Sequence, residues 1–271
     1  MYSRTIPISK RTERVATHQR LIRAARRAIA PYLPTNLTFP SAKQIIYFEG
    51  KNGPDGLASK HSVNDDPPDF YNPNNPSDRA LLTEIKNRIY NLHIALKKKN
   101  SIRVNFEAAW LSHVVIDGLT PAHHQPFKEQ LKEIDPRESH EISSRFKRIF
   151  YSGGDSAIES FILNWKRLGP HGLGTNHMMF EAGIDFLVMP MSPRSLAEIE
   201  ITSTDLKKIK SGHFISLYTV AIKEIDKLRM FERYEESSWT TELATEVREK
   251  LIPVAVRMVV LAWLAAIYKG K

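Results

Sequence analysis

The sequence predicts an all-α protein, a single multi-helix bundle with a long loop after its first helix. Apolar residues recur at helical spacing through most of the 271 residues, and strand-like alternation is limited to the short, ambiguous stretch 44–49. Hydrophobic residues make up 42% of the chain, which is enough for a substantial core. Because no repeat or low-complexity tract divides the sequence, we expect one domain over residues 1–271.

The first helix is expected from about residue 12 to residue 32. Val15, His18 and Ile22 fall on one apolar stripe, so the His18 side chain should point into the bundle. Residues 34–77 are rich in Pro, Asn, Asp and Gly, and they predict a long loop. A loop of this length inside a compact domain is uncommon unless it is functional or disordered.

Two helices should follow, at about 79–99 and 102–117. Ser77-Asp78 can cap the first helix, because short polar side chains accept hydrogen bonds from the free N–H groups of a first turn, and Asn100-Ser101 starts the second. The second of these helices ends in the residues that carry most chemical information.

The second half of the chain also predicts helices, with a turn at 169–172. They are expected near 138–150, 157–165, 175–187, 203–231 and 239–268. The apolar stretch 251–268 contains Pro253 and Arg257 and is only marginally long enough to span a bilayer. This favours a packed terminal helix over a membrane anchor.

The main candidate site is the segment His113-Val-Val-Ile-Asp117-Gly-Leu-Thr-Pro121-Ala-His123. His113 and Asp117 are four residues apart, so on a helix they point from the same face. The turn at Pro121 ends the helix and lets His123 swing back beside them. Imidazole and carboxylate groups gathered in this way are typical ligands of zinc, and the chain has no Cys to offer a thiolate instead.

A second helical pair, His177 and Glu181, has the same spacing as the first. A single pair of this kind arises often by chance, and a lone His on an apolar face is usually a packed core residue. The two pairs occur together with His123 and an inward-pointing His18, which favours a cluster of divalent metal ions. The metal-site core would cover about residues 12–187, with the C-terminal helices at about 203–268 packing behind it.

The charge balance favours an anionic partner. The net charge is +9, with basic clusters at 20–27 and 97–99. These clusters are also explained by solvated helix faces and ends, the plainer interpretation. The sequence contains no glycine-rich phosphate loop, no nucleophile elbow and no Cys-based motif. The N-terminus has no apolar run of signal-peptide type, which predicts a cytoplasmic protein, or a secreted one whose leader was removed.

The pattern His-x3-Asp-x5-His, followed downstream by His-x3-Glu, resembles the zinc-dependent phospholipase C family and the related zinc-dependent single-strand nucleases. The resemblance covers about residues 12–187, although only the motifs themselves are specific. It implies an all-α bundle that holds one to three zinc ions and cleaves phosphate esters. It implies metal ligands at His18, Asp66, His113, Asp117, His123, His177 and Glu181. Asp117 would bridge metals, and Asp66, or its neighbour Asp65, would bind metal or orient the attacking water.

The chain departs from the family pattern at two ligands. The family has a further His after the loop Asp, where this sequence has Ala80 and Leu81. His61 or His93 could substitute in space, although the first fits a solvent-exposed loop residue and the second a packed core residue. The N-terminal Trp of the family has no counterpart before His18. The segment 124–176 is longer than in the phospholipases, consistent with an inserted helix or lid.

The sequence therefore predicts a zinc-dependent hydrolase of phosphate esters, acting on a phospholipid or nucleic-acid phosphodiester through a metal-activated water. Two alternatives remain open: the family fold with a reduced site that binds metal without efficient hydrolysis, and a non-enzymatic basic module that binds nucleic acid or anionic membrane. The expected partner is an anionic phosphate ester, with no obligate protein partner. Membrane contact without a transmembrane segment is compatible with all three.

Overall fold

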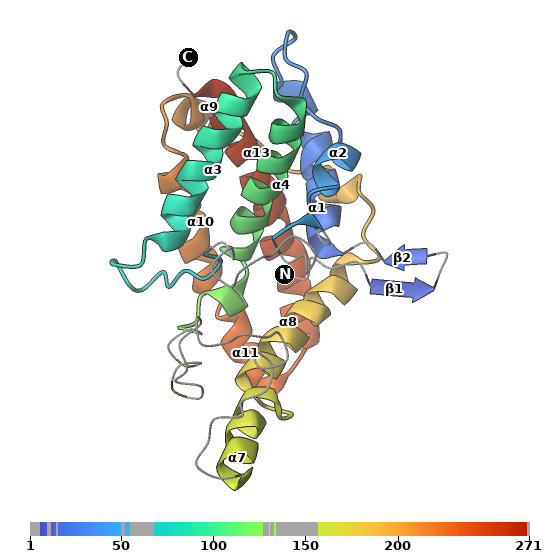
Figure 1. The fold of residues 1–271 in the computed structure, drawn as a ribbon, viewed down its shortest axis with the longest axis vertical. Coiled ribbons are helices and arrows are strands. Elements are labelled where there is room, and N and C mark those ends of the chain that lie inside the picture. The colour runs from blue at the N-terminus through green and yellow to red at the C-terminus, as the bar shows by residue number, and fades with distance from the viewer. Residues whose placement is uncertain are drawn as a thin grey trace.

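The structure is a computed structural model that describes residues 6–9, 12–14, 16–49, 52–54, 68–126, 130, 133 and 157–269. These residues form a helical bundle, so the predicted all-α fold class is confirmed (Figure 1). The helix over 138–150 that the sequence predicts lies outside the described residues. One small antiparallel hairpin, β1 (Ile6–Ser9) and β2 (Thr12–Arg14), stands at the side of the bundle.

The first helix starts later than its sequence pattern suggests. Residues Thr12–Arg14 pair with Ile6–Ser9 as a strand, and α1 spans Thr17–Ala28. The sequence prediction of a start near residue 12 is therefore wrong. The physical reason is that Thr12 and its neighbours pair with Ile6–Ser9 across the hairpin and so satisfy backbone groups outside a helix.

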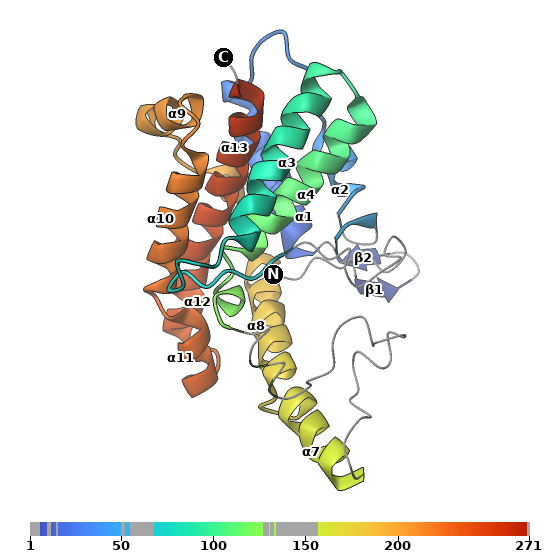
Figure 2. The same cartoon turned by 60° about the vertical axis from the view of Figure 1, so that its left-hand side comes forward.

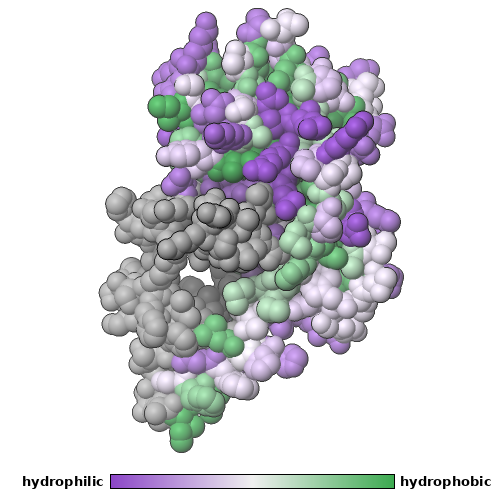
Figure 3. Space-filling view, turned by 90° about the vertical axis from the view of Figure 1, so that its right-hand side faces the viewer, coloured by the Kyte–Doolittle hydropathy of each residue, from purple (hydrophilic) through white to green (hydrophobic). Residues whose placement is uncertain are grey.

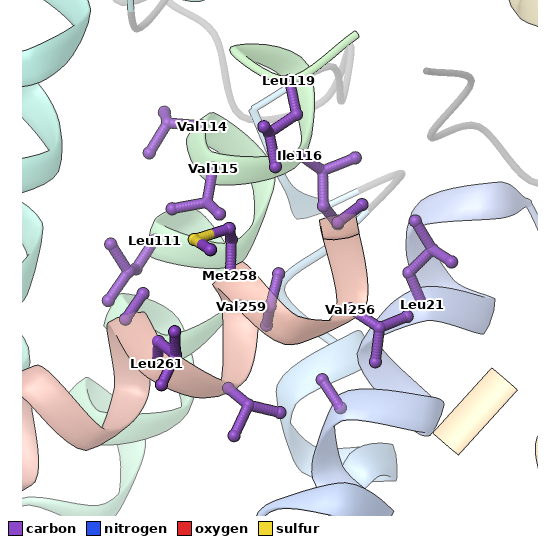
Figure 4. Packing of buried hydrophobic residues seen from close by; sticks show 14 of the residues in the cluster. Leu21, Leu111, Val114, Val115, Ile116, Leu119, Val256, Met258, Val259 and Leu261 are labelled. Carbon is purple, nitrogen blue, oxygen red and sulfur yellow. The ribbon is translucent and has the colours of Figure 1, made fainter. Parts of the chain in front are cut away.

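Four long helices form the centre of the bundle: α1, α3 (Ala80–Lys97), α4 (Ser101–Asp117) and α13 (Ile252–Tyr268). Helix α13 contacts the other three and lies among them (Figure 2). Met258 and Val259 of α13 face Leu111 and Val115 of α4 in the core (Figure 4). The indole N–H of Trp263 donates to the carbonyl of residue 108 at 3.1 Å, which fixes α13 against α4.

Helix α13 is a core helix in this structure. Within the described residues, one helical segment, Thr241–Tyr268, is long and apolar enough to cross a membrane, and 78% of its apolar window is buried inside the protein. Just before Pro253, the turn Val247–Leu251 widens to a π-helix. Proline has no N–H to donate to the carbonyl four residues back, so a local widening lets the helix continue.

The sequence prediction for the start of α3 is wrong in detail. Arg79 stands at the N-cap without a side-chain hydrogen bond. Asp78 instead accepts a hydrogen bond at 2.8 Å from the N–H of Asn72, so its carboxylate is already used in the preceding turn. Helix α4 starts at the predicted Asn100-Ser101, and the Asn100 side chain caps it by accepting a hydrogen bond from the N–H of Arg103 at 3.0 Å.

The predicted long loop is not loop throughout. Ser41 and Gln44 form a reciprocal capping box that starts the short helix α2 (Ala42–Ile46). The ambiguous stretch 44–49 is thus the end of this helix and the turn after it. Residues 55–67, which include His61, lie outside the described part of the chain.

The second half of the chain is more broken than predicted. The pattern at 203–231 is interrupted at Gly212 (φ 79°) and Arg229 (φ 48°), where a regular helix cannot continue. The remaining elements are η1 (Ala30–Tyr32), η4 (Pro121–His123), α7 (Ala157–Leu168), α8 (Leu173–Val188), η6 (Ser195–Ala197), α9 (Ser203–Lys210), α10 (Phe214–Asp226), α11 (Met230–Ser237) and α12 (Thr241–Glu246). Helix α7 forms one end of the molecule (Figure 1).

Candidate metal centre

The first donor set joins α1 to the C-terminal end of α4. Nε2 of His18 lies 3.0 Å from Oδ1 of Asp117, and Nε2 of His113 lies 2.9 Å from Oδ2 of the same carboxylate. The ligand atoms of the three residues lie within 4.8 Å of one another. All three residues are buried, with exposed fractions of 0%, 1% and 3%. The predicted inward orientation of His18 therefore brings it to the α4 pair.

The second donor set joins the turn after α4 to helix α8. Nε2 of His123 lies 3.1 Å from Oε1 of Glu181, and Nε2 of His177 lies 3.6 Å from the same oxygen. Nδ1 of His123 lies 3.0 Å from the carbonyl oxygen of Asp69. Phe70 stacks on the His123 ring with centroids 4.6 Å apart. The side chains of His177 and Glu181 are 17% and 14% exposed, so this set meets solvent.

The turn after Asp117 brings the two sets together. The N–H of Thr120 donates to the carbonyl of Asp117, and the N–H of His123 donates to that of Thr120, both at 2.8 Å. This 3-10 turn, which begins at Pro121, returns His123 toward the helix end as the spacing predicts. The charge of Asp117 contributes to raising the pKa of His123, so the two sets interact electrostatically.

Gly118 is required where α4 ends. A Cβ on this residue would lie 2.3 Å from Leu81 Cδ2 and 2.3 Å from the hydroxyl of Tyr218. The same hydroxyl donates to the carbonyl of Val115 at 2.9 Å and holds the last turn of α4. The end of α4, and with it Asp117, is therefore fixed by close packing against α3 and α10.

A buried hydrogen bond also connects the two donor sets across the bundle. The hydroxyl of Thr17, beside His18 on α1, donates to Oδ1 of Asp185 at 3.0 Å. Asp185 lies one turn after Glu181 on α8. Helix α1, which supplies the first set, is thus tied to helix α8, which supplies the second.

Glu49 is a site residue that the sequence analysis missed. It is 3% exposed, and its Oε1 lies 2.9 Å from Nδ1 of His113 and 3.2 Å from Nδ1 of His18. The residue follows α2, in the stretch whose secondary structure was ambiguous from the sequence. Its one signal is that it lies four residues after Ile45, which is fully buried.

The carboxylates of both sets are held in their ionised form. Burial alone would raise the pKa of Asp117, but nearby positive charge, to which His113 and His18 contribute, holds the pKa well below its usual value. For Glu181, burial is likewise outweighed by nearby positive charge and by hydrogen bonds from His123 and His177, and the pKa is well below its usual value. Buried anions beside imidazoles are a donor chemistry that suits a divalent cation.

For the histidines, burial lowers the pKa and the neighbouring carboxylates raise it. Burial lowers the pKa of His18, but Asp117 and Glu49 more than compensate, and the pKa is raised. Burial lowers the pKa of His123, and Glu181 together with Asp117 raises it above its usual value. Each of the two sets could hold a metal ion.

The other residues considered in the sequence analysis either lie outside the described residues or belong to neither donor set. Asp65, Asp66 and His61 lie outside the described residues, so their predicted roles stay predictions. His93 points to α13, with Nδ1 3.0 Å from the carbonyl of Ala266, and does not replace the missing family ligand. His124 is also buried, with Nε2 3.1 Å from the carbonyl oxygen of Gly118 and Nδ1 3.4 Å from Oδ1 of Asp226.

A comparison of the protein with models of known families, with curated proteins and with solved structures found no match.

Proposed function

We propose that the protein is a metal-dependent hydrolase of phosphate esters and that its metal is zinc. The observation that carries the proposal is the pair of adjacent donor sets, each with two imidazoles and a carboxylate, joined through the end of α4. Imidazole and carboxylate groups without thiolates match zinc better than they match hard cations such as Mg²⁺, which prefer all-oxygen sites.

Each part of the chain has a distinct task in this proposal. His18, His113 and Asp117 hold one ion inside the bundle, while His123, His177 and Glu181 hold one beside solvent. The Asp69 carbonyl and the Phe70 ring orient His123. A bound divalent ion supplies electrophilic stabilisation of the phosphoryl group and makes water a stronger nucleophile at neutral pH.

The charge and surface of the protein support an anionic, partly apolar substrate. The net charge of +9 favours phosphate esters in general. On α7, Ile158, Phe161, Ile162 and Trp165 are spaced along one stripe and are 46–73% exposed. Apolar side chains are visible at the lower end of the molecule, where α7 lies (Figure 3). This stripe makes a phospholipid the first substrate to test, with nucleic acid second.

The test uses zinc-reconstituted full-length protein with three substrates: bis(p-nitrophenyl) phosphate, phosphatidylcholine vesicles and single-stranded DNA. We expect hydrolysis of at least one, abolished by chelation and by His123→Ala. His93→Gln is the matched control, since it changes a histidine outside both sets. Zinc bound without turnover would instead support a reduced site. Salt-dependent binding of DNA or vesicles without metal would support the non-enzymatic module.

A further inference from the structure

The first donor set has carboxylates on both sides of its two imidazoles. On one side, the Nε2 atoms of His18 and His113 face Asp117 at 3.0 and 2.9 Å. On the other side, the Nδ1 atoms of the same two rings face Glu49 Oε1 at 3.2 and 2.9 Å. The rings themselves lie 4.8 Å apart. Glu49, which follows α2, therefore lies beside both imidazole rings, at the nitrogens that do not face Asp117.

The two sides are not equivalent. The ligand atoms that lie within 4.8 Å of one another come from His18, His113 and Asp117, and Glu49 is not part of that group. Asp117 offers a different oxygen to each ring, while one oxygen of Glu49 lies near both. An ion that enters this set would therefore lie at the Asp117 side, with Glu49 behind the rings.

The polar atoms left without a hydrogen bond point to a second contact. Within the described residues, Nδ1 of His18 and Oε2 of Glu49 are both buried and have no hydrogen-bond partner, because Oε1 lies near the His18 ring without the geometry of a hydrogen bond. One is a potential donor and the other an acceptor. The same carboxylate therefore holds a spare acceptor beside the ring that lacks one, while its Oε1 is engaged with His113.

We propose that Glu49 is a shared positioning residue, accepting a hydrogen bond from Nδ1–H of His113 and from Nδ1–H of His18. A neutral imidazole carries its proton on one nitrogen, so a proton fixed at Nδ1 leaves the Nε2 lone pair free for a metal. Glu49 thereby sets both rings in the form and orientation that bind one ion with Asp117. The proposal rests on the metal-binding part of the proposed function and not on hydrolysis.

Glu49→Gln is the decisive variant, because an amide offers only one oxygen and turns an NH₂ group toward the other ring. In a His123→Ala background, which leaves the first set as the complete one, zinc affinity is measured by competition with a chromogenic chelator. We expect Glu49→Gln to weaken it by about 10- to 100-fold, the usual cost of losing an outer hydrogen-bond partner of a metal ligand. In zinc-loaded wild-type protein, ¹⁵N NMR of labelled histidine should find both His18 and His113 protonated at Nδ1, and the variant should lose this at one ring.

Glu107→Gln is the matched control. Glu107 is also fully buried, on α4, but its carboxylate pairs with two arginines, Arg88 and Arg103. We expect the control to lower stability and to leave zinc affinity and the histidine tautomers unchanged. If Glu49→Gln does not fold, Glu49→Asp replaces it, since it keeps both oxygens one methylene further from the rings and should weaken zinc binding to a smaller degree.

Unchanged affinity and tautomers in the Glu49 variant would overturn the proposal, as would an equal loss in Glu107→Gln. The outcome is separable from that of the proposed function. A zinc-loaded protein that hydrolyses no phosphate ester, yet loses affinity on Glu49→Gln, would refute the hydrolase and keep the positioning role. A zinc-loaded protein that hydrolyses a phosphate ester, and whose zinc affinity is unchanged by Glu49→Gln, would support the hydrolase and refute the positioning role.

Discussion

The two donor sets contain the same kinds of ligand, but they differ in their access to solvent. The set on α1 and α4 is sealed in the core, and a further carboxylate, Glu49, lies behind its imidazoles. The set on α8 and the turn after α4 is partly open, and it is lined by the Phe70 ring. Closed metal sites generally serve stability, while catalytic sites keep a position open for water or substrate. We infer that the buried set contributes mainly to folding and the open set mainly to chemistry.

The largest effect should come from the centre of the buried set. Asp117→Ala removes the carboxylate that lies at Nε2 of both His18 and His113, leaving the two imidazoles buried with Glu49 alone. We expect a loss of about 3–5 kcal/mol in the free energy of unfolding, the usual cost of breaking a buried ion pair. Urea unfolding of the metal-free protein measures it. Glu181→Ala in the open set should lower the free energy of unfolding by less than about 2 kcal/mol. An equal loss in both variants would contradict the inference that the buried set contributes more to folding.

The open set should respond in activity more than in stability. His177→Ala removes a candidate ligand whose side chain is partly exposed. We expect turnover of a phosphodiester to fall at least about 100-fold, since even outer partners of metal ligands cost 10- to 100-fold. The midpoint of urea unfolding should change little. His213→Ala, in the exposed residue that starts α10, is the control. If the His177→Ala variant turns over substrate as fast as the wild type, His177 is not a ligand of the catalytic metal.

Local spacing predicted much of each set, because it depends only on helix geometry. His113 with Asp117, and His177 with Glu181, are i,i+4 pairs, so their shared face follows from the sequence as soon as a helix is assigned. His18 could also be oriented from the apolar stripe of its own helix. Which pairs meet across the bundle could not be predicted from periodicity, and it was inferred from the family resemblance.

The parts that sequence reasoning missed depend on long-range packing. Glu49 reaches the site because α2 packs against α1 and α4, and its spacing of four residues from Ile45 is too weak a signal to distinguish it from a surface carboxylate. The need for glycine at position 118 could not be predicted from the sequence either, because it arises from close contact with Leu81 and Tyr218 on other helices. The strand Thr12–Arg14 was missed because its pairing partner lies outside the periodic segment.

The link between the two sets can be tested separately from either. Thr17→Val keeps the shape of the side chain and removes the hydroxyl that donates to Asp185. We expect about 1–2 kcal/mol of destabilisation and a weaker stabilisation of the whole protein by zinc. Thr219→Val is a matched control, because its hydroxyl donates only within α10, to the carbonyl of Ile215. If both variants respond alike to zinc in thermal unfolding, the two sets are not coupled through this bond.

The smallest effect should come from the aromatic lining of the open set. Phe70 stacks on His123 with an interplanar angle of 18° and also approaches His177, so it restricts both rings from one side. Aromatic pairs of this kind contribute about 0.5–1.5 kcal/mol beyond their buried area, which corresponds to about two- to tenfold in an equilibrium constant. Phe70→Leu should therefore weaken zinc binding to the open set by that factor and leave the buried set unaffected. Zinc titration of the variant in a His18→Ala background, which leaves the open set as the complete one, isolates the effect. The same measurement in a His123→Ala background isolates the buried set. If Phe70→Leu weakens zinc binding there by the same factor, Phe70 acts through general stability, and its stacking does not distinguish the open set from the buried one.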